Sequence, residues 1–73
     1  MIKVYGSAIT IIQNGKKIVR TFTKITEFTI IEFNDISFLN EWTGESEEYF
    51  LSAVNKIEIQ FLGNKVFEFV NDN

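Results

Sequence analysis

The stretch Phe28–Trp42 constrains the fold most, because it consists of two apolar runs joined by Asn34-Asp35. Asn and Asp tolerate the positive φ angles that a tight two-residue hairpin turn requires. Such a turn places Ile30 opposite Leu39 and leaves apolar side chains on both faces of the ribbon. Both faces then need cover from other parts of the chain. The sequence therefore predicts that this hairpin lies in the middle of a small all-β protein.

A second hairpin is predicted at Asn14-Gly15, the strongest short-range turn signal in the chain. Strand-like residues precede it over 2–13 and follow it over 17–23. Alternation of side chains along the two strands gives one face that is the better candidate for the core. That face consists of Ile9, Ile11, Ile18 and Phe22, together with Arg20.

A third hairpin is predicted over residues 57–70, with Gly63-Asn64 as its loop. This loop assigns a core face to Ile57, Ile59, Phe61, Val66 and Val70, together with Glu68. It leaves Phe67 and Phe69 on the opposite face, either under a neighbouring layer or half exposed.

The segment after the polar run 43–48 fits two structures. Apolar residues at 49, 50, 53, 54 and 57 recur at helical spacing, and acidic residues precede them. Residues 49, 51 and 53 also share one face of a strand. We favour the strand because the flanking segments are strongly β, and one short helix around residues 45–55 is the alternative.

These patterns predict a single small β domain over residues 1–73. It is an antiparallel meander of five to seven strands that forms a barrel or a sandwich. The sequence contains no Pro, linker or low-complexity tract that marks a second domain.

The short chain has little stability to spare. A chain of 73 residues buries a small share of its surface compared with larger domains, and it has neither Cys nor His for a disulfide or a zinc site. Its composition is nevertheless 45% hydrophobic and 15% aromatic. We therefore expect additional stability from tightly packed aromatic side chains or from a partner chain, and a homo-oligomer in particular.

No secretion signal opens the sequence, and no apolar run is long enough for a membrane helix. We expect a cytoplasmic protein without membrane contact. Ile, Lys, Asn, Phe and Tyr, which have AT-rich codons, are abundant, and this indicates a low-GC bacterial genome or one of its phages.

Charge is distributed unevenly. Residues 1–26 contain five basic side chains and no acid, whereas the remainder contains all ten acids and two lysines. Basic strands that pair beside acidic ones would neutralise each other. The alternative is a molecule with a basic and an acidic end, suited to head-to-tail assembly or to an oppositely charged partner.

Catalytic groups are scarce. Without His or Cys, neither a Ser/His nor a Cys/His nucleophile can form, and metal sites based on imidazole or thiolate are excluded. Glu41, Glu45, Glu47 and Glu48 are the densest carboxylates, but a polar loop leaves them solvated. The four glycines are too widely spaced for a phosphate-binding loop. We expect no enzyme, no cofactor and no metal.

Protein binding is the function that these features favour. Sheet edges in so small a protein offer pairing sites for a second copy or for a partner strand, which the protein would bind or inhibit. Aromatic side chains beside a charged rim are typical of an interface. The predicted contact residues are Trp42, Glu45, Glu47, Glu48, Tyr49 and Phe50.

Single-stranded nucleic acid is the alternative partner, because small β barrels stack bases on aromatic side chains within a basic groove. The candidate residues are Lys16, Lys17, Arg20 and Lys24, with Tyr5 and Phe22 as stacking platforms. An acidic total, with a sequence pI of about 4.8, and the assignment of Phe22 to the core count against it.

Overall fold

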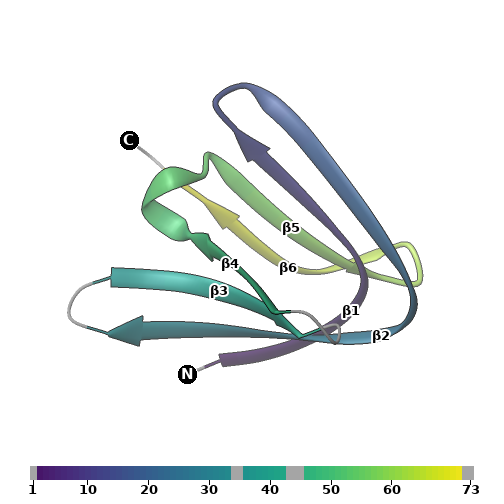
Figure 1. The fold of residues 1–73 in the computed structure, drawn as a ribbon. Coiled ribbons are helices and arrows are strands. Elements are labelled where there is room, and N and C mark those ends of the chain that lie inside the picture. Colours follow the sequence, from purple (N-terminus) through teal and green to yellow (C-terminus); the bar gives the residue numbers. More distant parts are fainter. Residues whose placement is uncertain (1, 34–35, 43–45, 72–73) are drawn as a thin grey trace.

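The computed structural model describes residues 2–33, 36–42 and 46–71, and the side chains of all of these except residues 33, 36–38, 40–42, 46 and 47. It contains one antiparallel sheet of six strands and a short 3-10 turn (Figure 1). The elements are β1 (Ile2–Gln13), β2 (Lys16–Phe33), β3 (Ile36–Trp42), β4 (Ser46–Phe50), η1 (Leu51–Ala53), β5 (Lys56–Phe61) and β6 (Asn64–Val70). The predicted all-β, antiparallel class is confirmed.

The strand order is β4-β3-β2-β1-β5-β6. The first four strands follow one another as a meander, and η1 then leads to β5, which pairs with the free side of β1. The predicted meander is therefore correct for the first four strands only, because the β1–β5 pairing joins segments far apart in the chain.

A sharp bend divides the sheet. Register along β1 and β2 shifts between Gly6, which lies opposite Thr26, and Ala8, which lies opposite Thr21. β2 therefore has three more residues than β1 across the shift, and both strands turn away from their earlier direction. We call residues 2–6 of β1, residues 26–33 of β2, β3 and β4 the β3–β4 leaf. Residues 8–13 of β1, residues 16–21 of β2, β5 and β6 form the β5–β6 leaf (Figure 1).

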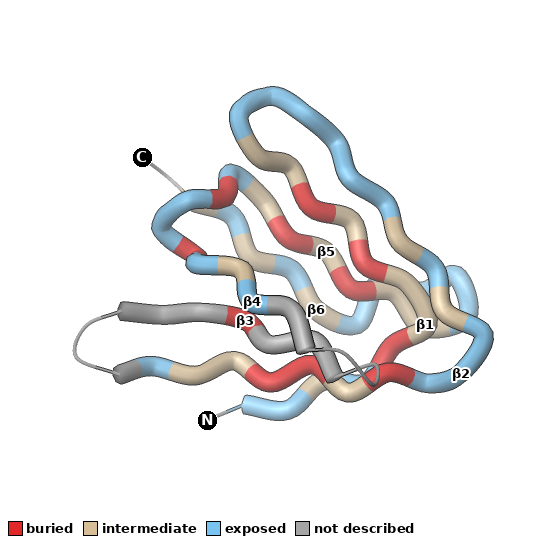
Figure 2. The backbone as a smooth tube through the Cα atoms, in the orientation of Figure 1, coloured by how far each residue is buried: buried red, intermediate tan, exposed pale blue. Residues whose placement is uncertain are grey.

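The core fills the space between the two leaves. Figure 2 shows buried positions along strands of both leaves, and the buried apolar residues form one cluster. Ile9, Ile11, Ile57 and Ile59 come from the β5–β6 leaf, Phe28 and Leu39 from the β3–β4 leaf, and Leu51 and Val54 from η1 and the residue after it. Phe22, in the bend, packs against Phe28 with ring centroids 6.0 Å apart.

Gly6 allows the leaves to meet at the bend. A Cβ at this position would lie 2.5 Å from Ile59 Cγ2 and 2.9 Å from the carbonyl oxygen of Gln60. Real side chains do not approach so closely, so only glycine fits here without moving β5.

The hairpin at Asn14-Gly15 has the turn and the register that the sequence predicts. Asn14 and Gly15 have φ angles of 53° and 75°, as a type I′ turn requires, and Ile9 and Ile11 are completely buried. Ile18, in contrast, remains 40% exposed, because β2 is the outer strand of its leaf at this point.

The central hairpin has the expected register, with Ile30 opposite Leu39. Its turn residues, 34 and 35, lie outside the described residues. Phe28 and Thr29 are both buried although successive residues of a strand point to opposite faces. Thr29, however, shares its face with Lys3 and Tyr5, which are exposed, so the predicted cover of both faces by other parts of the chain is not confirmed.

The predicted face assignment of the third hairpin is correct for β5, where Ile57 and Ile59 are buried in the core, but wrong for β6. Leu62 and Gly63, with φ angles of 50° and 82°, form the turn in place of Gly63-Asn64. An extra residue in β6 at Val66 then shifts the register, so that Phe67 lies opposite Ile59 and Phe69 opposite Ile57. The two phenylalanines pack against the core, and Val66, Glu68 and Val70 take the outer face.

The segment 46–56 combines both structures considered for it. Residues 46–50 form β4, and residues 51–53 make the single turn η1. Asn71 holds this turn from the far end of β6, because its side-chain amide donates to the carbonyl oxygens of Leu51 at 3.3 Å and Val54 at 3.2 Å. The end of β6 is thereby fixed to the connection between the leaves.

Candidate interaction surfaces

Open strand edges are the most prominent feature of this sheet. β4 and β6 end the strand order, and the shift at the bend also leaves parts of β1 and β2 outermost in their leaves. In the β5–β6 leaf, the outermost strands are residues 16–21 of β2 and β6 itself, with no further strand beside them among the described residues. An outermost strand exposes backbone hydrogen-bonding groups to any strand that can reach it.

The turn after β1 determines which backbone groups of β2 face the open edge. Residues that flank a two-residue hairpin turn form a hydrogen-bonded pair, and such pairs then recur at every second residue. Gln13 and Lys16 form the first such pair. The N–H and C=O groups that point away from β1 are therefore those of Lys17, Val19 and Thr21. The carbonyl of Ile12 agrees with this count, because it faces away from β2 and accepts from the Asn55 N–H at 2.7 Å.

The same reasoning applies to β6. The Asn71 N–H donates to the Asn55 carbonyl at 2.9 Å, and this pair is in register with Phe69–Ile57 and Phe67–Ile59. The phenylalanines therefore direct their backbone groups toward β5. Glu68 and Val70 direct theirs toward the open edge.

Apolar side chains accompany the open edge of β6. Val66 is 48% exposed and Val70 is 52% exposed, and both lie on the outer face. Leu62, in the turn before β6, is 75% exposed, and its backbone N–H donates to the Ser7 hydroxyl at 3.2 Å. Sequence reasoning did not identify these residues, because the predicted register places Val66 and Val70 in the core.

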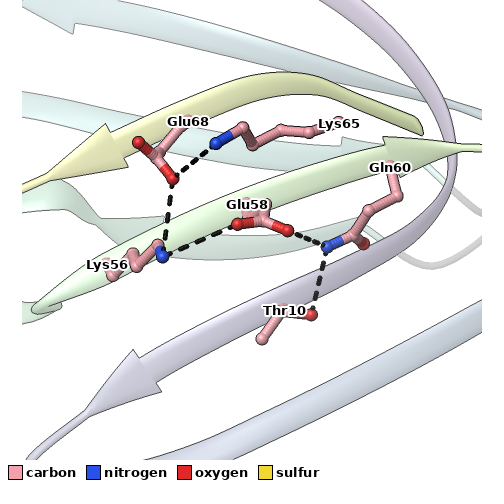
Figure 3. A network of polar contacts seen from close by, with 6 residues as sticks. All are labelled: Thr10, Lys56, Glu58, Gln60, Lys65 and Glu68. Carbon is pink, nitrogen blue, oxygen red and sulfur yellow. Dashed lines mark hydrogen bonds and ion pairs between the residues drawn. The ribbon is translucent and has the colours of Figure 1, made fainter. Parts of the chain in front are cut away.

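A polar network covers the outer face next to this edge (Figure 3). Lys56 Nζ lies 3.6 Å from a carboxylate oxygen of Glu58 and 3.4 Å from one of Glu68, and Lys65 Nζ lies 3.1 Å from the same Glu68 oxygen. The Gln60 amide donates to Glu58 at 2.7 Å and contacts the Thr10 hydroxyl at 3.4 Å. The hydrogen bond from Lys65 and its positive charge, with Lys56 contributing less, lower the pKa of Glu68.

The open edge of β2 is basic. Lys16, Lys17 and Lys24 are exposed, and Val19, with 54% of its surface accessible, lies among them. β1, the neighbouring strand, contains no acidic residue. The edge therefore combines free backbone groups, an exposed valine and positive charge.

Arg20 differs from the lysines of the predicted basic group. Its guanidinium donates to the Tyr49 hydroxyl and lies 5.7 Å from the centroid of the Phe22 ring. Because Tyr49 belongs to β4, this contact joins the two leaves. Phe22 packs against the core, which counts against its proposed use as a base-stacking platform.

The structure describes only part of the predicted acidic and aromatic patch. Glu48 is exposed, Phe50 is 49% exposed, and Tyr49 packs partly against the core. Glu45 and the side chains of Trp42 and Glu47 lie outside the described residues. The grouping of these six residues remains a prediction.

Within the described part of the chain, no three carboxylates gather as a metal site would require. Nor do these residues include a helix long and apolar enough to span a bilayer. No protein-family model matches the sequence, and neither the curated proteins nor the solved structures provide a match.

Proposed function

We propose that this protein is a non-catalytic interaction module that associates with a second copy of itself through β6 and the turn before it. The absence of His and Cys from the sequence supports the non-catalytic part. The observation that carries the interaction is the conformation of Leu62.

Leu62 combines backbone strain with exposure. Its φ angle of 50° is in the left-handed region, which costs a residue with a Cβ about 1–2 kcal/mol. Asn or Gly adopts this conformation more easily. The side chain is 75% exposed, so it gains little from the core in return. A contact with another molecule explains why leucine occupies this position.

The edge of β6 provides the rest of the contact. Its outward backbone groups, at Glu68 and Val70, can form a ladder with an antiparallel β6 from the second copy. A two-fold axis through that ladder brings the exposed valines of the two copies together. Lys56 and Lys65, which already hold Glu68, offset repulsion between the two carboxylates.

Association can be tested by light scattering and sedimentation across the micromolar range. We expect a concentration-dependent dimer that is lost in the double variant V66K/V70K, because charged side chains on an edge prevent strand pairing. V19K is the matched control, since Val19 is similarly exposed but belongs to the other edge of the leaf. The V19K variant should dimerise at the same protein concentration as the wild type. A monomer at all concentrations would contradict the proposal.

Leu62→Asn separates stability from association. Asn tolerates the left-handed conformation, so chemical denaturation of the monomer should show a gain of about 1 kcal/mol. The dimer should dissociate at higher protein concentration than it does in the wild type. If the variant is more stable and dimerises equally well, Leu62 has no role in the contact.

A further inference from the structure

We infer that residues 16–21 of β2 form a second docking edge, which accepts an acidic, extended segment of another protein as an added strand. This edge lies on the side of the leaf opposite β6. The inference does not depend on self-association through β6.

The backbone of this edge is regular. Lys17, Val19 and Thr21 direct their N–H and C=O groups outward, and the register with β1 is uninterrupted from the turn to Thr21. β6, in contrast, contains the extra residue Val66. An unbroken row of outward groups is what an added strand requires.

The charge of the edge selects the partner. Lys16 and Lys17 are exposed at its start, and Lys24 is exposed further along the same strand. The sequence has no acid before Glu27, and the nearest acid across β1 is Glu58, which Lys56 and Gln60 already contact. Two such edges carry charge of the same sign and therefore repel each other. An acidic strand, in contrast, is attracted to this edge.

The order of side chains along the edge specifies the partner further. Lys16 and Lys17 are followed by two exposed apolar residues, Ile18 and Val19, so each face of the strand presents a lysine and then an apolar group. An antiparallel partner that matches both faces reads apolar, apolar, acidic, acidic. Antiparallel pairing is also slightly more stable per residue than parallel pairing.

NMR titration with a short peptide tests the inference. The probe is acetyl-Ser-Val-Val-Glu-Glu-Ser-amide, and the controls are its reversed sequence and the version with Lys in place of Glu. We expect the probe to shift the amide resonances of Lys17, Val19 and Thr21 and to slow their exchange with solvent. The reversed peptide should bind more weakly, and the lysine peptide should not bind.

Two charge reversals of equal size provide the matched protein variants. K17E should weaken binding of the probe roughly fivefold or more, because an attractive cross-strand pair becomes repulsive. K65E, on the opposite edge, should leave it nearly unchanged. V66K/V70K should also bind the probe normally, so this test can succeed or fail independently of dimer formation.

The inference is wrong if the probe does not bind at millimolar concentration or if it shifts only resonances of β6. Equal effects of K17E and K65E on binding would also overturn it. Oligothymidylate that binds this edge while the acidic peptide does not would also overturn it and identify a nucleic-acid interface instead.

Discussion

At the level of single residues, Gly6 determines how closely the two leaves approach each other. Gly6→Ala places a Cβ against the completely buried Ile59 and the backbone of Gln60. Neither neighbour can move aside easily, so we expect a loss of about 1–3 kcal/mol in the free energy of unfolding. Chemical denaturation measures this loss.

Gly15→Asn is the control for Gly6→Ala. Nothing lies within 4 Å of an added Cβ at Gly15, and Asn tolerates its positive φ. This substitution should change the free energy of unfolding by no more than about 0.5 kcal/mol. Equal effects of the two substitutions would mean that close contact between the leaves at Gly6 does not matter for stability.

Glu68 gives the protein a pH-dependent contribution to stability. Because its pKa is lower in the folded chain, the ionised form stabilises the fold above the unfolded-state pKa. This stabilisation is lost as the pH falls through the folded-state pKa. Glu68→Gln should therefore be less stable than the wild type at neutral pH, and the two melting temperatures should converge in acid. Added salt should also reduce the difference at neutral pH, and a difference independent of both pH and salt would exclude this ionic origin.

At the level of the elements, the direction of the backbone groups in β2 predicts that proline at two neighbouring positions destabilises the fold to very different extents. Val19→Pro removes an N–H that faces the open edge, whereas Ile18→Pro removes one that faces β1. We expect Ile18→Pro to lower the free energy of unfolding by roughly 3 kcal/mol and Val19→Pro by much less. If Val19→Pro is the more damaging substitution, the assignment of the open edge is wrong.

The hairpin at residues 57–70 illustrates where prediction from sequence failed. Gly63-Asn64 has suitable residues for a turn, and Leu62-Gly63 requires leucine to adopt a left-handed conformation. The observed turn and the extra residue at Val66 nevertheless bring Phe67 and Phe69 onto the core side. Burial of two aromatic side chains outweighs the turn preference of one residue.

The other two hairpins were predictable because local signals and apolar alternation agree. Asn14-Gly15 suits its turn, and the register of the central hairpin follows from its apolar pattern. The close approach of the leaves at the bend was not predictable, because Gly6 lies next to Ile59 and Gln60, which are more than fifty residues away in the sequence. No local pattern encodes such a contact.

Prediction of the candidate surfaces was limited for the same reason. The sequence grouped Arg20 with three lysines by proximity and grouped Tyr49 with an acidic loop, but the fold joins Arg20 to Tyr49 across the leaves. The lysines, in contrast, are exposed. The β6 edge depends on the register of the third hairpin, so it could not be identified before that register was known.

At the level of the whole molecule, the charge asymmetry of the sequence is partly neutralised within the fold. Lys3 of the basic region lies 3.8 Å from Glu27, the first acid of the chain, whereas Lys56 and Lys65 are paired with acids of their own region on β5 and β6. The lysines along β2 have no acidic residue on the strand beside them. The β5–β6 leaf thus has one basic edge and one edge with exposed apolar side chains, and we propose a different partner for each.

Amide hydrogen exchange, measured by NMR at low and high protein concentration, tests this account most directly. Phe67, Phe69, Ile18 and Arg20 should exchange slowly at both concentrations, because their N–H groups face a neighbouring strand. Glu68 and Val70 should exchange fast in dilute solution and become protected as the dimer forms, while Lys17, Val19 and Thr21 remain fast. Protection that rises with concentration along β2, or at neither edge, would contradict the account.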